Sequence, residues 1–441
     1  MELTIFQADE GDCLLLKGAD GKRLLVDGGT PEAYHGHVAP TLEGLRQAGA
    51  ALDVVYVSHI DGDHIGGVLQ MLDDEVAWRV HEYQVRSGNA GHPSPCVPRP
   101  SKVNAVWHNG FSEQLQENAG PIEEMLARCA RILSGAENAE LRALGDLQRN
   151  LASSTRQAIQ LSRRIGPRQL NIPLNPESRG KMMMVRDDRS SIRLGGASVV
   201  VIGPAESEME RLRDEWNKWL KKNKEALQEI DREASADEES LGARVSDWGA
   251  RLGRESVRAP EISRVLLAAL VQAQELGRRG KVTTPNLASL MLLVEEGATT
   301  VLLTGDGHAK DIVSGLEHHG KMSSGHLHVN VFKVPHHGSE HNLDRGFCKA
   351  VTADHYLFCA NGKDDNPDLR IVQAIVDSRL AGSDPRPFKL WFNSSAAATD
   401  RPENKVHMAK VERKVKKLAA TSQGRMSYMF LEGDDSLQIS L

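Results

Sequence analysis

Cysteine is scarce in this sequence. The 441 residues contain five cysteines, and no two of them form a CxxC pair. Such a pattern fits neither a disulfide framework nor a zinc site ligated by cysteine, and it is typical of proteins from a reducing compartment. We therefore expect a cytoplasmic protein whose core forms without disulfides.

Long apolar runs are also missing. No stretch reaches the roughly 18 consecutive apolar residues that a membrane span requires. The first residues, MELTIFQADEGDCLLLKG, lack the basic region and apolar run of a targeting segment. The sequence predicts a soluble protein without a membrane partner.

The sequence has neither an excess of positive charge nor many aromatic residues. The formal net charge is -6, and aromatic residues make up 4% of the chain. A negative balance argues against a protein that coats nucleic acid, and few aromatic side chains argue against stacking platforms for single strands. Only local basic clusters remain as a means of guiding a polyanion into a cleft.

The hydrophobic period of the sequence changes several times. Up to residue 70, short apolar runs between turns predict strands, with one helix near Tyr34–Gln47 and a second after the pair Gly66-Gly67. Helical spacing follows at about 120–165 and 206–276. Strand patterns return at 192–204 and again after residue 288, and the last of them, YMFLEGDDSLQISL, predicts a closing hairpin. The pattern indicates a mixed α/β protein.

One short stretch, SHIDGDHIGG, concentrates metal-binding side chains. His59, Asp61, Asp63 and His64 lie within six residues directly after the apolar strand DVVYV. Burying such groups at the end of a strand is unfavourable unless a partner compensates their lost hydration, and imidazoles with carboxylates are typical ligands of divalent metals. The alternative is an acidic loop in which the aspartates cap a helix and the histidines are incidental.

The same stretch resembles a known signature. HIDGDH is similar to the HxHxDH motif of the metallo-β-lactamase fold, in the HxDxDH form found in the hydrolase domain of ComEC-type DNA-uptake proteins and their free-standing relatives. Further segments resemble that family in the same order: FQADEGDCLLLKGADGKRLLVDGG, VVVIGP, PNLASLMLLVEEGATTVLLTGD and FKVPHHGSEHN. The resemblance covers roughly 1–110, 190–204 and 282–441.

The resemblance implies an αββα sandwich with two helical insertions. The first half of the core domain would be 1–110, and a helical insertion would occupy 111–190. A core strand would follow at 191–204, a second insertion at 205–281, and the second half of the core at 282–441. Insertions far longer than ordinary connections are expected to form a lid, a substrate platform, or a surface for a protein partner or a second copy of the chain.

The resemblance also implies further site residues. Asp306, in LLTGD, would be a carboxylate that bridges two metals, and a plain turn is the alternative reading. His337 would be the last histidine ligand; His336 could take its place, and one of the two is expected to support the ligands from behind. Asp27 would hold a metal ligand or its backbone by hydrogen bonds, with a turn residue as the alternative.

Two departures from the family pattern stand out. Asn286 and Ser289 occupy the region where many relatives carry another metal-binding histidine, so that ligand is absent and the two residues are expected to lie behind the ligands. Asn366 and Asp368 stand where ComEC-type chains often read His-Pro, and we expect them at the substrate mouth unless they belong to a surface loop. The other histidines nearby are not expected to be ligands: His318, His319, His326, His328 and His341.

The implied chemistry is hydrolysis by metal-activated water. Two divalent ions would share Asp306 and a hydroxide, with Asp63, His64 and Asp306 as the catalytic ligands. Asp61 replaces a histidine of the family motif and makes the donor set harder. The mixed set of imidazoles and carboxylates makes zinc our first choice, and the added carboxylate makes manganese the alternative.

The substrate is the least defined expectation. The resemblance implies a nuclease or phosphodiesterase acting on DNA or RNA, with a small-molecule hydrolase of lactones, thioesters or phosphoesters as the alternative. A partner-regulated interaction protein with a structural metal site is a third reading. Basic side chains that could guide a polyanion, or merely balance acidic helices, are Arg156, Arg163, Arg164, Arg168, Arg251, Arg254, Arg258, Arg278, Arg279 and Lys281.

Overall fold

The computed structural model describes residues 1–109, 156–207, 209–210, 214, 218, 289–382 and 384–441. Most of the predicted insertions, 111–190 and 205–281, lies outside these residues, so the insertion boundaries stay predictions. Among the residues that are described, no helix combines the length and apolar character needed to cross a membrane.

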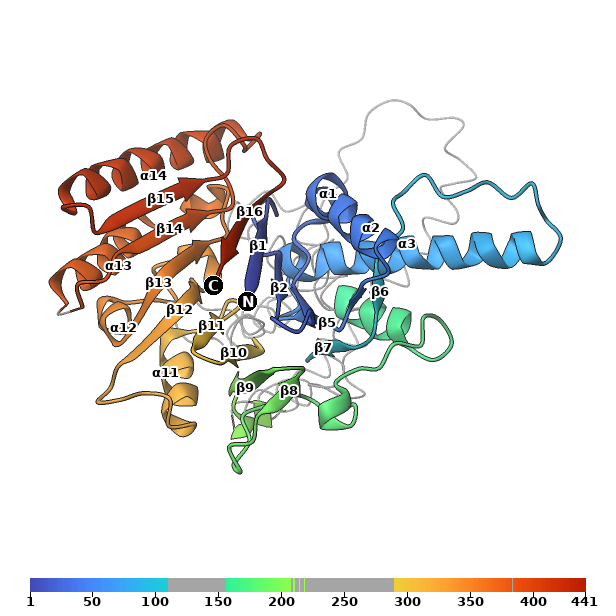
Figure 1. The fold of residues 1–441 in the computed structure, drawn as a ribbon, viewed down its shortest axis with the longest axis horizontal. Coiled ribbons are helices and arrows are strands. Elements are labelled where there is room, and N and C mark those ends of the chain that lie inside the picture. Colours follow the sequence, from blue (N-terminus) through green and yellow to red (C-terminus); the bar gives the residue numbers. More distant parts are fainter. Residues whose placement is uncertain (110–155, 208, 211–213, 215–217, 219–288, 383) are drawn as a thin grey trace, which may run out of the picture.

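The first of two large sheets is built mainly from the N-terminal part of the chain (Figure 1). Its strands are β1 (Glu2–Phe6), β2 (Leu14–Lys17), β3 (Arg23–Val26), β5 (Val54–Val57), β7 (Val106–His108) and β16 (Ser436–Ser440). They are ordered β16-β1-β2-β3-β5-β7. A separate ladder of two short strands, β4 (Ala51–Leu52) and β6 (Lys102–Val103), lies beside it.

The second large sheet contains the later strands. These are β8 (Ile192–Leu194), β9 (Ala197–Gly203), β10 (Met291–Glu296), β11 (Thr299–Leu303), β12 (Leu327–Lys333), β13 (Val351–Phe358), β14 (Phe388–Phe392) and β15 (Met426–Phe430). Their order runs from β15 back to β8 in sequence, which places β11 to β15 side by side as parallel neighbours.

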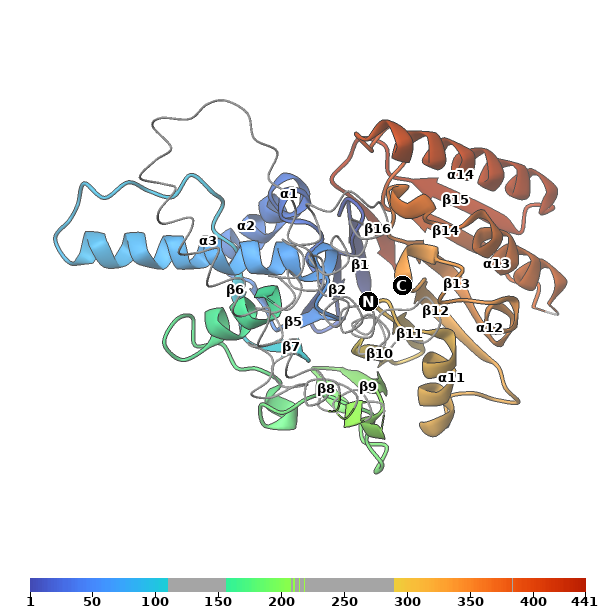
Figure 2. The same ribbon diagram turned by 180° about the vertical axis from the view of Figure 1, so that it is seen from behind.

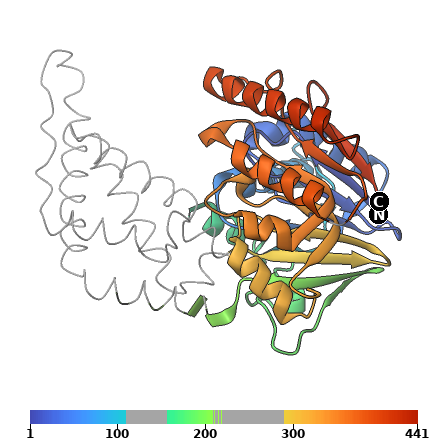
Figure 3. The same cartoon turned by 90° about the vertical axis from the view of Figure 1, so that its left-hand side faces the viewer.

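The predicted closing hairpin is wrong. β15 forms one edge of the second sheet, whereas β16 crosses to the first sheet and pairs antiparallel with β1. The two ends of the chain consequently meet: the backbone N–H of Leu441 donates to the carbonyl of Met1 at 2.9 Å, and the termini lie together in Figures 1 and 3. β16 therefore pairs with β1, at the edge of the first sheet, and not with β15, the strand that precedes it in the sequence.

Helices cover the outer face of each sheet (Figures 1 and 2). Those beside the first sheet are α1 (Pro31–Ala33), a π-helical turn (Tyr34–Val38), α2 (Ala39–Gln47) and the long α3 (Gly62–Arg86). Those beside the second are α11 (Ala309–His318), α12 (Arg345–Ala350), α13 (Leu369–Ala381) and α14 (Pro402–Thr421), which Figure 3 shows as one layer.

Three apolar cores hold these layers together. Along β2, Leu14 and Leu16 belong to the core between the sheets, and Leu15 belongs to the core beneath the first helical layer. Likewise Val331 faces the other sheet, while Phe332 packs toward the helices α11 to α14. Because both faces of the strands are buried, their sequences read as nearly continuous apolar runs. The predicted αββα sandwich is confirmed.

The second predicted helix begins earlier than expected. α3 starts at Gly62, inside the HIDGDH motif, so the pair Gly66-Gly67 lies within the helix and does not precede it. A Cβ atom on Gly67 would lie 2.0 Å from the carbonyl oxygen of Gly28, and one on Gly28 would lie 2.3 Å from the backbone nitrogen of Val68. These glycines allow the helix to pack directly against the loop after β3.

The strand directions determine where a site can form. β3, β5 and β7 are mutually parallel, as are β11 and β12 in the other sheet. The carboxyl ends of parallel strands meet at one edge of a sheet, which is where ligand-binding loops of such sheets lie. The loops after β3, β5, β11 and β12 carry Asp27, His59, Asp306 and His336-His337.

Candidate metal centre

The loop after β5 brings the ligand-type side chains into the interior. His59 is 3% exposed and His64 is fully buried, although both are polar. Asp61 occupies the N-cap position of α3, and Asp63 and His64 lie in the first turn of the helix. The start of the helix thus fixes the relative directions of the two aspartates and the second histidine.

Asp27 lies beneath this loop and is fully buried. One of its oxygens accepts a 2.7 Å hydrogen bond from the backbone N–H of Ser58, and the other accepts bonds from the Ser58 hydroxyl at 2.7 Å and from His64 Nδ1 at 2.9 Å. The Ser58 hydroxyl oxygen also lies 3.1 Å from His59 Nδ1. Because a carboxylate only accepts, His64 carries a proton on Nδ1 and directs Nε2 away from Asp27.

The two histidines after β12 are arranged in the same way. His337 Nδ1 donates to the carbonyl oxygen of Cys359 at 2.7 Å, and His336 Nδ1 lies 2.5 Å from the side-chain oxygen of Asn342. Both histidines have left-handed backbone conformations, with φ of 48° for His336 and 55° for His337. Such conformations are strained for histidine, and their clustering at one loop is typical of functional sites.

Asp306 lies where the imidazoles converge. Its oxygens lie 3.6 Å from Nε2 of His59, 3.5 Å from Nε2 of His64, 3.7 Å from Nε2 of His336 and 3.6 Å from Nε2 of His337. The preceding residue must be glycine for Asp306 to approach the imidazoles, because a Cβ atom on Gly305 would lie 2.7 Å from Cβ of Ser58. The Thr-Gly-Asp turn therefore packs tightly against the strand that ends in His59.

The remaining aspartates of the motif approach the same region. His337 Nε2 lies 3.3 Å from Asp63 Oδ2, and His59 Nε2 lies 3.6 Å from Asp61 Oδ2. The first separation is that of a long hydrogen bond, and the second is too long for one. Ligands bound at about 2.1 Å to a tetrahedral ion lie about 3.4 Å from one another, so the separations suit atoms that share a divalent metal.

Buried polar atoms without partners support this interpretation. His59 Nε2, His64 Nε2 and Asp306 Oδ1 are buried and have no hydrogen-bond partner among the described residues. One ligand atom from each of these three side chains lies within 4.8 Å of the other two. Buried polar groups nearly always have a partner, so orphan atoms gathered in this way fit a metal-binding site.

The charges of the site reinforce one another in the metal-free protein. Burial alone would lower the pKa of His64 and of His337, but the carboxylates around them, Asp306 among them, outweigh it and raise both pKa values above the ordinary 6.5. Burial alone would raise the pKa of Asp63 and of Asp306, but the histidines hold both pKa values below the ordinary 3.8. Metal binding therefore competes with protonation of these imidazoles.

We expect metal to stabilise the protein more as the pH rises. In the metal-free protein the raised pKa values of His64 and His337 contribute stability that is complete below 6.5 and is lost above it, as the pH passes through the raised folded-state values. The lowered pKa values of Asp63 and Asp306 contribute stability above 3.8 that is lost as the pH falls. Protonation of the imidazoles opposes metal binding over the same range.

Thermal unfolding with chelator and with Zn²⁺, between about pH 5 and pH 8.5, measures this effect. The gap between the two Tm values should widen with pH. The variant His326→Ala, which removes an exposed imidazole elsewhere, should give the same profile. A gap that stays constant across the range would contradict the assignment of these histidines as ligands.

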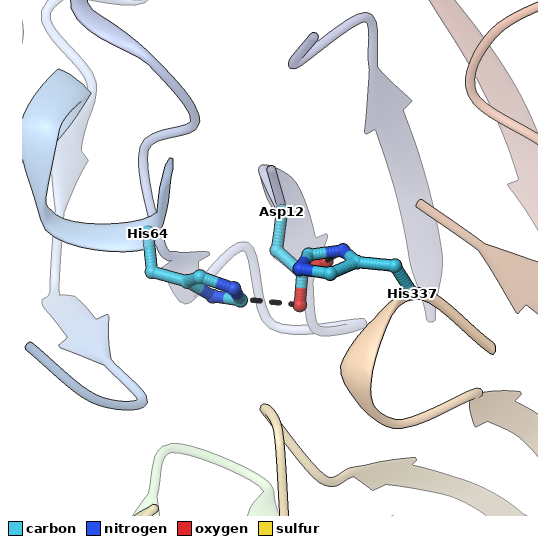
Figure 4. A group of neighbouring side chains, drawn as sticks. All are labelled: Asp12, His64 and His337. Atoms are coloured by element: carbon cyan, nitrogen blue, oxygen red, sulfur yellow. Dashed lines mark ion pairs between the residues drawn. The ribbon is translucent and has the colours of Figure 1, made fainter. Parts of the chain in front are cut away.

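A second group of side chains faces the opposite side of the imidazoles. Asp12 lies between His64 and His337 (Figure 4), with its carboxylate 3.6 Å from His64 Nδ1 and 3.7 Å from His337 Nδ1. These three residues are close enough to hold a metal ion. The Nδ1 atoms, however, already donate to Asp27 and to the carbonyl of Cys359. The Nε2 side, toward Asp306, is therefore the better metal site.

Two other buried residues at this edge, Lys333 and His108, were not predicted to belong to the site. Lys333 is 1% exposed and forms an ion pair with Asp12; its signal in the sequence is a single charge within the apolar run VNVFKVP. His108 ends β7 and is 1% exposed, and burial lowers its pKa to about 4. His108 ends a strand that is parallel to β5, and this position could have indicated that it lies near the site.

The remaining predicted site residues lie at different distances from the metal ligands, and one of them is outside the described residues. Asn286 lies outside the described residues. Ser289 is fully buried, and its hydroxyl has no hydrogen-bond partner in the described part of the chain; its Cβ would lie 3.6 Å from a Cβ on Gly305. Asp368 accepts a 2.7 Å bond from the backbone N–H of Glu340 and so holds the loop that carries the histidine pair. Asn366 is half-buried, and its place at a substrate mouth stays a prediction.

The sequence also agrees with a known family over part of its length. A family model described as the metallo-beta-lactamase superfamily matches residues 7–92, a segment that contains Asp27 and the HIDGDH motif. A comparison with curated proteins found no match. The finer resemblance to ComEC-type proteins stays a prediction. The matched segment and the converging histidines and carboxylates together indicate a metal-dependent hydrolase.

Proposed function

We propose that the protein is a phosphodiesterase that cleaves nucleic acid with a water activated by two divalent metals. The observation that carries this proposal is the environment of Asp306. One of its oxygens faces Nε2 of His64, whereas the other faces Nε2 of His59, His336 and His337. A carboxylate whose two oxygens face different imidazoles is suited to bridge two cations.

The side chains divide between two positions. His59, Asp61, Asp63 and His337, on the side of Asp306 Oδ2, would hold one ion, and His64, on the side of Asp306 Oδ1, would help to hold the other. When bound, the ions would lower the pKa of a water molecule toward 7 and neutralise charge that develops on the attacked group. The number of carboxylates favours zinc with mixed ligands and keeps manganese as the alternative.

The protein residues have supporting tasks in this reaction. Asp27 and the Cys359 carbonyl orient the imidazoles of His64 and His337. Burial raises the pKa of the Cys13 and Cys359 thiols well above the ordinary value, which keeps both in the poorly nucleophilic thiol form. Direct attack by water therefore suits the site better than a covalent intermediate on cysteine.

A lysine near the site supports an anionic substrate. Lys363 is partly exposed and forms a 2.8 Å ion pair with Glu10. Its charge also interacts with Asp63, one of the proposed ligands. A cation that interacts with a proposed ligand suits contact with a phosphate better than contact with a neutral lactone or thioester.

Purified protein reconstituted with Zn²⁺ or Mn²⁺ tests the proposal. The substrates are end-labelled single- and double-stranded DNA and RNA, a simple aryl phosphodiester, a lactone and a thioester. We expect metal-dependent cleavage of phosphodiesters, lost in His64→Ala and retained in His326→Ala.

Two other results would refute the proposed reaction. Hydrolysis of the lactone or thioester alone would assign the protein to the small-molecule hydrolases. Bound metal without hydrolysis of any substrate would favour the interaction protein with a structural metal site.

A further inference from the structure

A lysine is buried beside the proposed metal ligands. Lys333 ends β12 and is 1% exposed, and the residues before and after it in the chain, Phe332 and Val334, belong to the apolar core. An ammonium group loses much of its hydration when it is buried, and the loss is tolerated only where close anions and hydrogen-bond acceptors replace water. Its partners therefore indicate why a charge occupies this position.

Among the described residues, the partners of the Lys333 ammonium group belong to the metal centre or touch it. Its ammonium group pairs with the carboxylate of Asp12 and donates a 3.0 Å hydrogen bond to the carbonyl oxygen of Gly305. It also lies 3.8 Å from Oδ1 of Asp306. Because β11 and β12 are parallel neighbours, a side chain at the end of β12 reaches the turn that ends in Asp306.

The partner Asp12 has a second pair of neighbours. Asp12 is 1% exposed, and its carboxylate faces the Nδ1 atoms of His64 and His337, at 3.6 Å and 3.7 Å. Those Nδ1 protons point instead to Asp27, at 2.9 Å, and to the carbonyl of Cys359, at 2.7 Å. An uncompensated charge on Asp12 would attract both protons and turn both rings away from the ion-binding side.

We propose that Lys333 is a positioning residue for the metal centre, a permanent internal cation that neutralises Asp12 and so keeps the two imidazoles oriented. The inference rests on the proposed metal site. With Lys333 in place, Asp12 attracts neither the imidazole protons nor a stray cation, and the His64 and His337 rings keep Nε2 directed at Asp306. The ammonium group of Lys333 thus takes the place of a metal ion beside Asp12 and the two Nδ1 atoms.

Three variants separate this role from simple packing. Lys333→Met keeps the length and loses the charge, Lys333→Arg keeps the charge, and the double variant Asp12→Asn/Lys333→Met removes both charges together. Lys321→Met is the matched control, because Lys321 pairs with Glu295 at 2.8 Å on the surface. Co²⁺ is the probe, since its visible spectrum reports ligand geometry; its affinity is measured by calorimetry, and circular dichroism checks the fold.

We expect Lys333→Met to weaken Co²⁺ binding by about 10- to 100-fold, as removal of a group that orients metal ligands does, and to change the visible spectrum. Lys333→Arg and the double variant should recover most of the affinity, and Lys321→Met should match the wild type. The double variant decides the matter even if Lys333→Met does not fold, since it leaves no buried charge unpaired.

Two results would overturn the inference while leaving the metal site intact. One is a folded Lys333→Met with wild-type affinity and spectrum. The other is a double variant that binds Co²⁺ tenfold or more weakly than the wild type. Failure of the wild type itself to bind Co²⁺ would refute the proposed metal site, and this inference with it.

Discussion

Replacing Asp306 with asparagine is expected to lower kcat/KM by at least about a thousandfold, roughly 4 kcal/mol of lost transition-state stabilisation. An asparagine keeps the shape of the side chain but offers one oxygen and an NH₂ group that cannot bind a cation. The oxygen atoms of Asp306 lie 3.5 Å from His64 Nε2 and 3.6 Å from His59 Nε2, so either orientation of the amide removes a ligand from one of the two positions.

Metal content and activity together measure this effect. Elemental analysis should fall from close to two divalent ions per chain toward one or none, while circular dichroism stays unchanged. Asp377→Asn makes the same chemical change on the exposed side of α13, where the carboxylate accepts a hydrogen bond from Gln373, and should keep wild-type activity. Wild-type turnover by a metal-loaded Asp306→Asn would remove Asp306 from the mechanism.

The fold was predictable where local pattern and long-range structure agree. Leu14, Leu15 and Leu16 alternate between two cores, so their strand is visible in the sequence as a short apolar run. The parallel strands of the second sheet are visible in the same way. The closing hairpin failed because β15 and β16 satisfy the local pattern of a hairpin equally well. Their separation depends on the free edge beside β1, which no neighbouring residue in the sequence signals.

The candidate site divides in the same way. The HIDGDH motif is visible because its ligand-type residues are adjacent in the chain. The contact between Lys333 and Asp12 is not, because it joins the two halves of the sequence through the packing of two sheets. The partner of His337 Nδ1 is a backbone carbonyl, at Cys359. Any residue type could supply that carbonyl, so its identity carries no signal.

Replacing Asp27 with asparagine is expected to weaken metal binding by about a hundredfold, the upper end of what orienting partners of metal ligands contribute. Asp27 has a left-handed backbone, with φ of 54°, which asparagine also tolerates, so the fold should persist. The two oxygens of Asp27 accept three hydrogen bonds, from the N–H and hydroxyl of Ser58 and from His64 Nδ1. An amide cannot accept all three.

Either orientation of the new amide places a donor against a donor. With NH₂ toward His64, the imidazole accepts through Nδ1 and carries its proton on Nε2, which blocks the lone pair that faces Asp306. With NH₂ toward the Ser58 N–H, a buried donor pair repels and the loop that carries His59 shifts.

The loss of Zn²⁺ affinity is measured by competition with a chromogenic chelator. It should persist at about pH 8.5, because its cause is a proton on the wrong nitrogen of a neutral ring and not competition between metal and protons. Asp434→Asn, at an exposed position, is the control. Recovery of wild-type affinity by Asp27→Asn at high pH would show that Asp27 acts only through its charge and not by fixing the tautomer of His64.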